Sequence, residues 1–321
     1  MVNVLIIGAT GYIGQAICSS LIRSGDHRVF GLARTPAKAK ELGKEEVIPI
    51  LGSIAENAEL LKTIDAEHIN IVVDAAGANQ ESHVLLEALK KIGAARLEAA
   101  SKSGITIPKL GFIYCSGTWL HGISNKPVND LIPVAAFNSP NAPAELTSWR
   151  PALENAILAA RDVLDVIIIR PALVYGRSGA IWSAFFNPIL EAVKKDTDSV
   201  AIPLDANSRP GLVHVDDVAS GFHAAVEKLP LISGTGVYPI FDLVTSQESM
   251  RDIIEFAAKE LGYKGKVELV GPGEDLFAKA MSTSMNGSSG RAKQLLGWEP
   301  KRVSGFVQGM DAFAKAFMAA S

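Results

Sequence analysis

The sequence predicts an α/β protein with a doubly wound parallel sheet of the Rossmann type and a smaller C-terminal lobe that binds substrate. Three observations predict this fold. Short apolar segments alternate with helical segments over roughly the first 230 residues, as in a parallel sheet covered by helices on both faces. A glycine-rich loop follows the first apolar segment directly. The chain has 321 residues, 48% of them hydrophobic, which is enough to bury a large core.

The expected strands are short, apolar and rich in Val, Ile or Leu, as strands buried on both faces must be. They are expected at residues 2–7, 28–33, 47–51, 71–75, 110–115 and 166–169. Helices are expected at residues 12–24, 82–103 and 151–162. The first of these helices carries an apolar stripe through Ile13, Ile17 and Leu21, and Gly25 is expected to end it.

This pattern divides the chain into two parts. Residues 1–175 are assigned to a dinucleotide-binding Rossmann domain, to which residues 211–245 return. The alternation of strands and helices is lost over residues 176–210 and 246–321, which we assign to a substrate-binding lobe. The lobe is expected over the C-terminal edge of the sheet, where ligands bind in such folds.

Composition and charge narrow the range of functions. The formal charge is −3, from 31 basic and 34 acidic residues, and no long run of like charge occurs, so neither nucleic acid nor an anionic membrane is an expected partner. Cys18 and Cys115 lie in apolar segments and are expected to be buried thiols in a reducing compartment. The apolar segment near the N-terminus is too short for a secretory core or a membrane span, so we expect a cytoplasmic enzyme.

The loop between the first strand and the first helix predicts dinucleotide binding. Glycine allows the turn to be tight, the backbone to approach a pyrophosphate, and the helix to pack closely on the strand. The pyrophosphate is then expected at the N-terminus of the helix, where free N–H groups and the helix dipole favour an anion. A purely structural turn is the alternative. The expected cofactor-binding residues of this loop are Gly8, Thr10, Gly11, Tyr12, Ile13 and Gly14.

The end of the second strand favours NADP(H) over NAD. A domain that selects NAD carries Asp or Glu about 20 residues past the glycine loop, to accept hydrogen bonds from the ribose hydroxyls. Here the strand ends in Arg34, whose guanidinium suits a 2′-phosphate, and Thr35 and Lys38 are expected to assist. The alternative is that Arg34 is only a solvated residue at the end of a strand.

Several further motifs follow in a fixed order. They are VVDAAG at 72–77, YCSGTWLHG at 114–122, RPALVYG at 170–176, VHVDDVA at 213–219 and LGWEP at 296–300. With the glycine loop, they make the chain resemble the extended or atypical short-chain dehydrogenase/reductase superfamily, the group of nucleotide-sugar epimerases, dehydratases and related reductases. The resemblance covers nearly the whole chain.

The resemblance implies further positions around the cofactor. Ser53 and Ile54 are expected to flank the adenine, whereas Ala75, Ala76 and Gly77 are expected beside the ribose. The segment with Pro171, Leu173 and Val174 is expected to border the nicotinamide. No metal is expected, although His214, Asp216 and Asp217 lie close together in the sequence. One of the two aspartates is instead expected to cap the helix that begins near Val218.

The chain departs from this superfamily at the proton donor. Relatives use a Ser or Thr after the fifth strand, together with a Tyr and a Lys four residues later. Aligning Glu154 with the acidic residue that commonly follows the Lys puts Leu146 at the Tyr and Arg150 at the Lys. No Tyr occurs between residues 123 and 174, so a small alignment error does not restore the pair. Arg150 can still hold ribose hydroxyls, but it is a poor base.

Other side chains are candidates for the missing role. Ser116 and Thr118 can polarise a carbonyl, and His121 and Tyr175 are candidates for supplying the proton. Packing is the alternative role for His121, and Tyr175 matches a relative's residue that has no catalytic duty. A reaction that needs little acid catalysis is also open, such as reduction of an iminium or a conjugated alkene.

We therefore expect an NADP(H)-dependent reductase of a small organic carbonyl, imine or conjugated double bond, with a non-standard proton donor. One alternative is a redox-neutral epimerase or isomerase with bound nicotinamide, acting on a substrate such as a nucleotide sugar. Another is a non-catalytic protein that senses NADP(H), whose cleft over the nicotinamide would be obstructed. The helices at 82–103 and 151–162 often form a dimer in relatives, so a homodimer is also considered.

Overall fold

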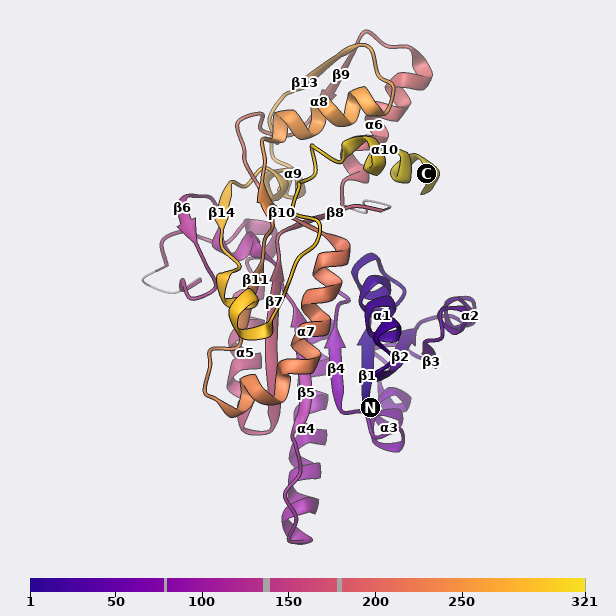
Figure 1. Cartoon of the computed structure of the whole chain (residues 1–321), viewed down its shortest axis with the longest axis vertical. Coiled ribbons are helices and arrows are strands. Elements are labelled where there is room, and N and C mark those ends of the chain that lie inside the picture. Colours follow the sequence, from indigo (N-terminus) through magenta and orange to yellow (C-terminus); the bar gives the residue numbers. More distant parts are fainter. Residues whose placement is uncertain (78–79, 135–138, 178–180, 321) are drawn as a thin grey trace.

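A computed structural model describes residues 1–77, 80–134, 139–177 and 181–320 of the chain. Its centre is a seven-stranded parallel sheet with the strand order β11-β7-β5-β4-β1-β2-β3 (Figure 1). The strands are β1 (Val2–Ile7), β2 (His27–Ala33), β3 (Ile48–Leu51), β4 (Ile71–Asp74), β5 (Leu110–Cys115), β7 (Leu164–Pro171) and β11 (Ile240–Leu243). The predicted doubly wound α/β fold is confirmed.

Helices cover both faces of this sheet because alternate residues of its strands point to opposite sides. In β1, Val4 and Ile6 belong to a core shared with α1 (Tyr12–Ser24), α2 (Pro36–Lys44) and α7 (Val215–Gly234). Their neighbours Leu5 and Ile7 belong to a second core. That core is shared with α3 (Ala58–Ala66), α4 (Gln80–Lys102), α5 (Arg150–Ala159) and the short η3 (Ala160–Asp162).

A second group of elements forms a lobe beyond the C-terminal ends of the main strands (Figure 1). It has its own aromatic core, in which Trp182, Phe186 and Phe306 are buried. Its helices are α6 (Ser183–Lys195), α8 (Met250–Glu260), α9 (Leu276–Met281) and α10 (Met310–Ala320). Its strands form two small sheets, of β8 (Leu173–Tyr175), β10 (Gly211–His214) and β12 (Ser246–Gln247), and of β9 (Ser199–Ile202) and β13 (Lys266–Leu269).

The two parts interleave more than the sequence pattern indicates. Within residues 211–245, α7 and β11 return to the main sheet, but β10 pairs with β8 and β12. From the C-terminal part, β14 (Met285–Gly287) pairs with β6 (Ser124–Val128), and Trp298 joins the core under α7. The Trp298 indole N–H donates to the Asp217 carbonyl at 2.9 Å. The segment around η4 (Ala292–Leu296) therefore packs on the Rossmann domain.

The expected cap of α7 is wrong. His214 occupies the cap position, and its Nδ1 accepts a hydrogen bond from the Asp216 N–H at 3.1 Å. The Asp217 carboxylate instead accepts from the backbone N–H groups of Lys301 and Arg302, at 2.7 and 2.8 Å. Asp217 thus holds the C-terminal segment, a contact between residues that are far apart in the sequence.

Both cysteines are buried and free, as expected from their apolar surroundings. Burial raises the pKa of the Cys18 and Cys115 thiols to about 12. Neither thiol is therefore an effective nucleophile near neutral pH. Within the described ranges, no helix is both long and apolar enough to cross a membrane.

Gly14 should tolerate no side chain. A Cβ at this position would lie 2.0 Å from the Gly8 carbonyl oxygen, which is backbone and cannot rotate away. We expect Gly14→Ala to lower the free energy of unfolding by roughly 2 kcal/mol or more, because α1 must move off β1. Gly43→Ala is the matched control, since its Cβ meets no atom within 4 Å in helix α2, and it should be neutral or slightly stabilising. Equal stabilities of the two variants in urea denaturation would contradict this packing.

Candidate functional site

The strand order reverses between β1 and β4, and ligands bind at such a switch point in doubly wound folds. Gly8 follows β1 with φ +82°, a conformation that favours glycine. A Cβ on Gly8 would lie 2.9 Å from the backbone of Ala75 and Ala76, so the loops after β1 and β4 are in close contact. No side chain caps the start of α1 at Gly11, which leaves that helix terminus available to an anion.

One hollow of about 310 Å³ lies beside this loop and gathers most of the residues expected around the adenosine half of the cofactor. Its lining comprises Ile7, Gly8, Thr10, Gly11, Leu32, Arg34, Ser53, Ile54, Ala75, Ala76 and Glu81. Glu81, in the first turn of α4, was not expected there, since it lies far from Arg34 in the sequence and matches no motif. Gly77 is exposed and outside this lining.

Thr35 and Lys38 are occupied elsewhere. The Thr35 hydroxyl accepts from the Lys38 N–H at 3.3 Å and so caps helix α2. The Lys38 ammonium pairs with Glu41 at 2.9 Å. Neither residue lines the hollow, so their assistance to a 2′-phosphate stays a prediction, whereas Arg34 is exposed at its wall.

A smaller pocket of about 130 Å³ lies on the other side of the glycine loop, where the nicotinamide half is expected. It is lined by Tyr12, Ile13, Ser116, Gly117, Thr118, Trp119, Arg150, Pro171, Ala172, Leu173, Val174 and Ile181. The Tyr12 hydroxyl donates to the Gly176 carbonyl at 2.6 Å, which joins the glycine loop to the segment after β8. Burial, and then the Asp216 carboxylate, raise the pKa of Tyr12, so its hydroxyl stays protonated.

Arg150 reaches this pocket from the first residue of α5. Its Nη1 would lie only 2.7 Å from a Cβ at Gly117, so the missing side chain of Gly117 makes room for the guanidinium. The Arg150 Nε and the Ser116 Oγ are both buried without a hydrogen-bond partner in the described part of the chain. The Trp119 Nε1 in the same pocket is also buried without a partner. Because buried polar atoms are normally paired, these atoms indicate a place for polar ligand atoms or water.

Two candidate proton donors lie elsewhere. His121, in η1 (Thr118–His121), is buried, and its Nε2 lies 2.7 Å from the Asp242 Oδ2. The Tyr175 hydroxyl donates to the Arg302 carbonyl at 3.3 Å, and burial raises its pKa. Neither side chain lines the nicotinamide pocket. The structure places His121 in a buried polar network instead, which matches its alternative role in packing.

That network lies behind the pocket. Arg170 forms a buried, two-pronged ion pair with Glu154. Its Nη1 is 4.0 Å from the Asp242 Oδ1, and the same Asp242 carboxylate contacts His121. Glu154 lies four residues after Arg150 on α5, and Arg170 lies on strand β7. Their ion pair therefore anchors the helix that carries Arg150.

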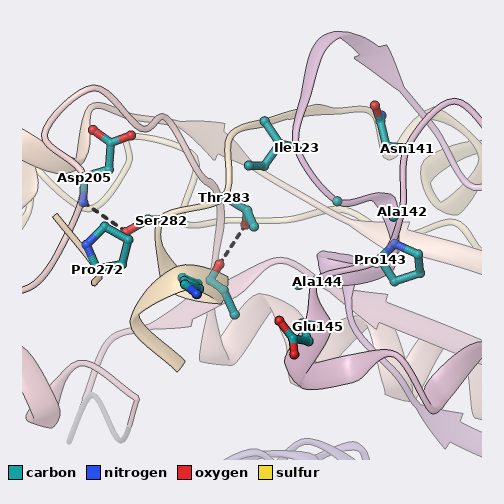
Figure 2. Close-up of a pocket in the computed structure, with 13 residues that line it drawn as sticks. Ile123, Asn141, Ala142, Pro143, Ala144, Glu145, Asp205, Pro272, Ser282 and Thr283 are labelled. Carbon is teal, nitrogen blue, oxygen red and sulfur yellow. Dashed lines mark hydrogen bonds between the residues drawn. The ribbon is translucent and has the colours of Figure 1, made fainter. Parts of the chain in front are cut away.

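A larger hollow of about 470 Å³ lies between the segments before and after β6 on one side and helix α9 on the other (Figure 2). It is lined by Gly122, Ile123, Asn141, Ala142, Pro143, Ala144, Glu145, Asp205, Pro272, Lys279, Ala280, Ser282 and Thr283. Helix α9 lines this hollow and also supports the nicotinamide pocket indirectly, because Phe277 packs edge to face on Trp119 with ring centroids 6.3 Å apart. Leu146, at the expected position of the proton donor, lies in η2 (Glu145–Thr147) and lines neither site.

Comparisons with known proteins agree with this fold. The sequence model of the NAD dependent epimerase/dehydratase family matches residues 4–238. Among solved structures, dTDP-glucose 4,6-dehydratase from Bacillus anthracis, in complex with NAD, has a TM-score of 0.75 at 18% identity and covers 99% of this chain and 97% of its own. UDP-glucuronic acid 4-epimerase from Bacillus cereus, in complex with UDP-glucuronic acid and NAD, has a TM-score of 0.71 at 18% identity and covers 99% and 100%. A search of curated proteins finds no match.

The pairing of Gly117 with Arg150 leads to a prediction. Gly117→Ala should push the guanidinium aside with little loss of stability, because the atom it meets ends a flexible side chain. We expect a loss of nicotinamide dinucleotide affinity of about tenfold, corresponding to ~1.4 kcal/mol, in both Gly117→Ala and Arg150→Ala. Fluorescence titration with NADPH and NADH measures this affinity. Unchanged affinity in both variants would remove Arg150 from the cofactor site.

Proposed function

Because the chain belongs to the NAD dependent epimerase/dehydratase family, we propose that it is an enzyme that binds a nicotinamide dinucleotide and acts on a small organic substrate beside it. One observation carries the proposal: most of the expected adenosine and nicotinamide residues line two hollows that flank the glycine loop. The close approach at Gly8 and the uncapped start of α1 fit a pyrophosphate between the two hollows. When bound, the nicotinamide supplies or accepts hydride.

The polar groups of the nicotinamide pocket favour reduction of a carbonyl. Among its described lining residues, the hydrogen-bonding side chains are Tyr12, Ser116, Thr118, Trp119 and Arg150. None is a carboxylate, an imidazole or an amine that could withdraw a proton near neutral pH. A guanidinium beside an unpartnered hydroxyl is instead suited to stabilise negative charge on a substrate oxygen. In this proposal Arg150 and Ser116 hold the oxygen of the substrate, and water supplies the proton.

The walls of the pocket favour a small and largely apolar substrate. Its volume is below the roughly 300–1,000 Å³ of typical small-molecule sites. Trp119 packs on Phe277, which stacks on Phe185 with ring centroids 5.9 Å apart and planes inclined by 6°. Of these rings Trp119 lines the pocket, with the two phenylalanines packed behind it, and apolar side chains such as Ile181 and Leu173 form much of the rest of the wall.

The second candidate function is a redox-neutral epimerase or dehydratase, and the comparisons favour it over a reductase. The family model carries that description, and both structural neighbours named above act on nucleotide sugars. The larger hollow beyond Trp119 is polar enough at Asp205 and Lys279 to receive a bulky polar group. Against this function stands Leu146, since such a reaction requires a proton to leave a substrate hydroxyl.

The third alternative, a protein that senses the cofactor without catalysis, predicts an obstructed cleft. The nicotinamide pocket is open beside Ser116 and Arg150, which supports an enzyme over a sensor. We keep NADP(H) as the proposed cofactor because Arg34 lies on the wall of the adenosine hollow. The carboxylate of Glu81 in the same hollow and the NAD bound by both neighbours favour NAD instead.

Substitution of Arg34 tests the choice of cofactor. We expect Arg34→Ala to weaken NADPH binding about tenfold or more and to leave NADH binding nearly unchanged, because it removes a charged contact to the 2′-phosphate. Glu81→Gln should change the ratio in the opposite direction by removing a negative charge. Calorimetric titration of each variant with both cofactors gives the ratio. A parent protein that binds NADH more tightly than NADPH, with no change in Arg34→Ala, would establish NAD.

The type of reaction is tested by supplying both small carbonyl-like substrates and nucleotide sugars. A reductase should consume NADPH at 340 nm with small aldehydes, ketones, imines or enones, and Ser116→Ala with Arg150→Ala should slow it more than about 100-fold. An epimerase should convert UDP- or dTDP-sugars without net consumption of cofactor and should retain tightly bound NAD through purification. Conversion of a nucleotide sugar by Arg150→Ala at the parent's rate would show that our site chemistry is wrong.

A further inference from the structure

A cluster of three metal-binding side chains lies at the opposite end of the sheet from the cofactor crevice. His27 is the first residue of β2, whereas the glycine loop follows the last residue of the parallel strand β1. His223 and Glu227 lie four residues apart on α7 and so share one face of that helix. Figure 1 shows α7 running from the lobe along the length of the sheet. One ligand atom of each residue lies within 4.8 Å of the other two. We propose that His27, His223 and Glu227 bind a divalent transition metal, with zinc as the best match.

Three of the four imidazole nitrogens support this assignment because they lack hydrogen-bond partners. Both ring nitrogens of His27 and the Nε2 of His223 are buried without a hydrogen bond in the described part of the chain. Buried polar atoms that make no hydrogen bond are rare in folded proteins and cost free energy. The two rings meet edge to face with centroids 5.4 Å apart, so the orphaned nitrogens are concentrated in one place. A shared metal ion would satisfy them together.

The second nitrogen of His223 is oriented by a neighbouring helix. Its Nδ1 lies 3.1 Å from the Ser20 Oγ on α1, which fixes the ring and leaves Nε2 as the ligand atom. That Nε2 is 3.5 Å from the Glu227 Oε1. Metal-ligating histidines usually have their other ring nitrogen held in this way. Zinc–nitrogen bonds of about 2.0–2.1 Å require only that the three side chains move closer together.

The charges around the cluster suit a cation. Glu227 and Asp26 bring negative charge to the same place, whereas the terminal amine of Met1 brings positive charge. Two imidazoles and a carboxylate form a donor set that zinc prefers, with water completing the coordination. Such a metal would tie β2 to α7, so we infer a role in stability.

Zinc titration of metal-free, untagged full-length protein tests the site. We expect calorimetry to show one zinc ion per chain and the thermal unfolding midpoint to rise with added zinc. His27→Gln and His223→Gln should each weaken zinc binding more than about tenfold and abolish the rise in midpoint. Ser20→Ala removes only the orienting hydrogen bond, so it should weaken zinc binding by about tenfold, less than the two histidine variants do. His83→Gln, which changes a histidine outside the cluster, is the matched control and should behave as the parent.

A cobalt titration of the parent protein tests the metal site even if a variant fails to fold. Bound to the parent protein in a four- or five-coordinate site, Co²⁺ should give a saturable visible absorption band that zinc displaces. Absence of that band, or zinc binding by His27→Gln and His223→Gln equal to that of the parent, would overturn the proposal. Because the readouts are metal binding and unfolding, failure here leaves the proposed enzyme function untouched.

Discussion

The close contact between the loop after β1 and the start of α1 is the constraint on which the cofactor site depends. Gly14 lies against the Gly8 carbonyl, and Gly8 lies against the backbone of Ala75 and Ala76, at distances that exclude a side chain. These contacts place the N-terminus of α1 at the point where the strand order reverses. The same loop carries Tyr12, whose hydroxyl binds the Gly176 carbonyl and joins the loop to the start of the lobe. A larger residue at Gly8 or Gly14 would therefore disturb both halves of the site.

Arg150 fits into the nicotinamide pocket because a glycine faces it. A Cβ at Gly117 would lie only 2.7 Å from the Arg150 Nη1, so Gly117 leaves the space that the guanidinium occupies. The helix that carries it is fixed by the buried pair of Glu154 with Arg170. Removing one partner of a buried ion pair costs roughly 3–5 kcal/mol, because the other charge is then left buried and uncompensated. The result is a pocket with a permanent positive charge and no described proton acceptor, which favours stabilising an oxyanion over removing a proton.

Much of the fold followed from local pattern. The order of apolar segments, the position of α1 and the parallel sheet were predicted correctly because buried strands and an amphipathic helix have distinct periodicities. Most expected cofactor residues line the two hollows because parallel strands all bring their carboxyl ends to one edge. The cap of α7 was predicted wrongly. The local sequence offers both an aspartate and a histidine as caps of this helix, and it does not decide between them. The Asp217 carboxylate instead accepts hydrogen bonds from the backbone of Lys301 and Arg302, which are distant in the sequence.

The sequence by itself determined the class of fold, the glycine loop and the absence of Tyr between residues 123 and 174, because each depends on residues close together along the chain. Only the tertiary structure decided which side chains meet. It placed Glu81 in the same hollow as Arg34, Arg150 beside Gly117, and His121 against Asp242 outside the nicotinamide pocket. It also brought His27 to His223 and Glu227 across almost 200 residues. The physical reason is that such contacts are set by how strands and helices pack, which periodicity along the chain does not specify.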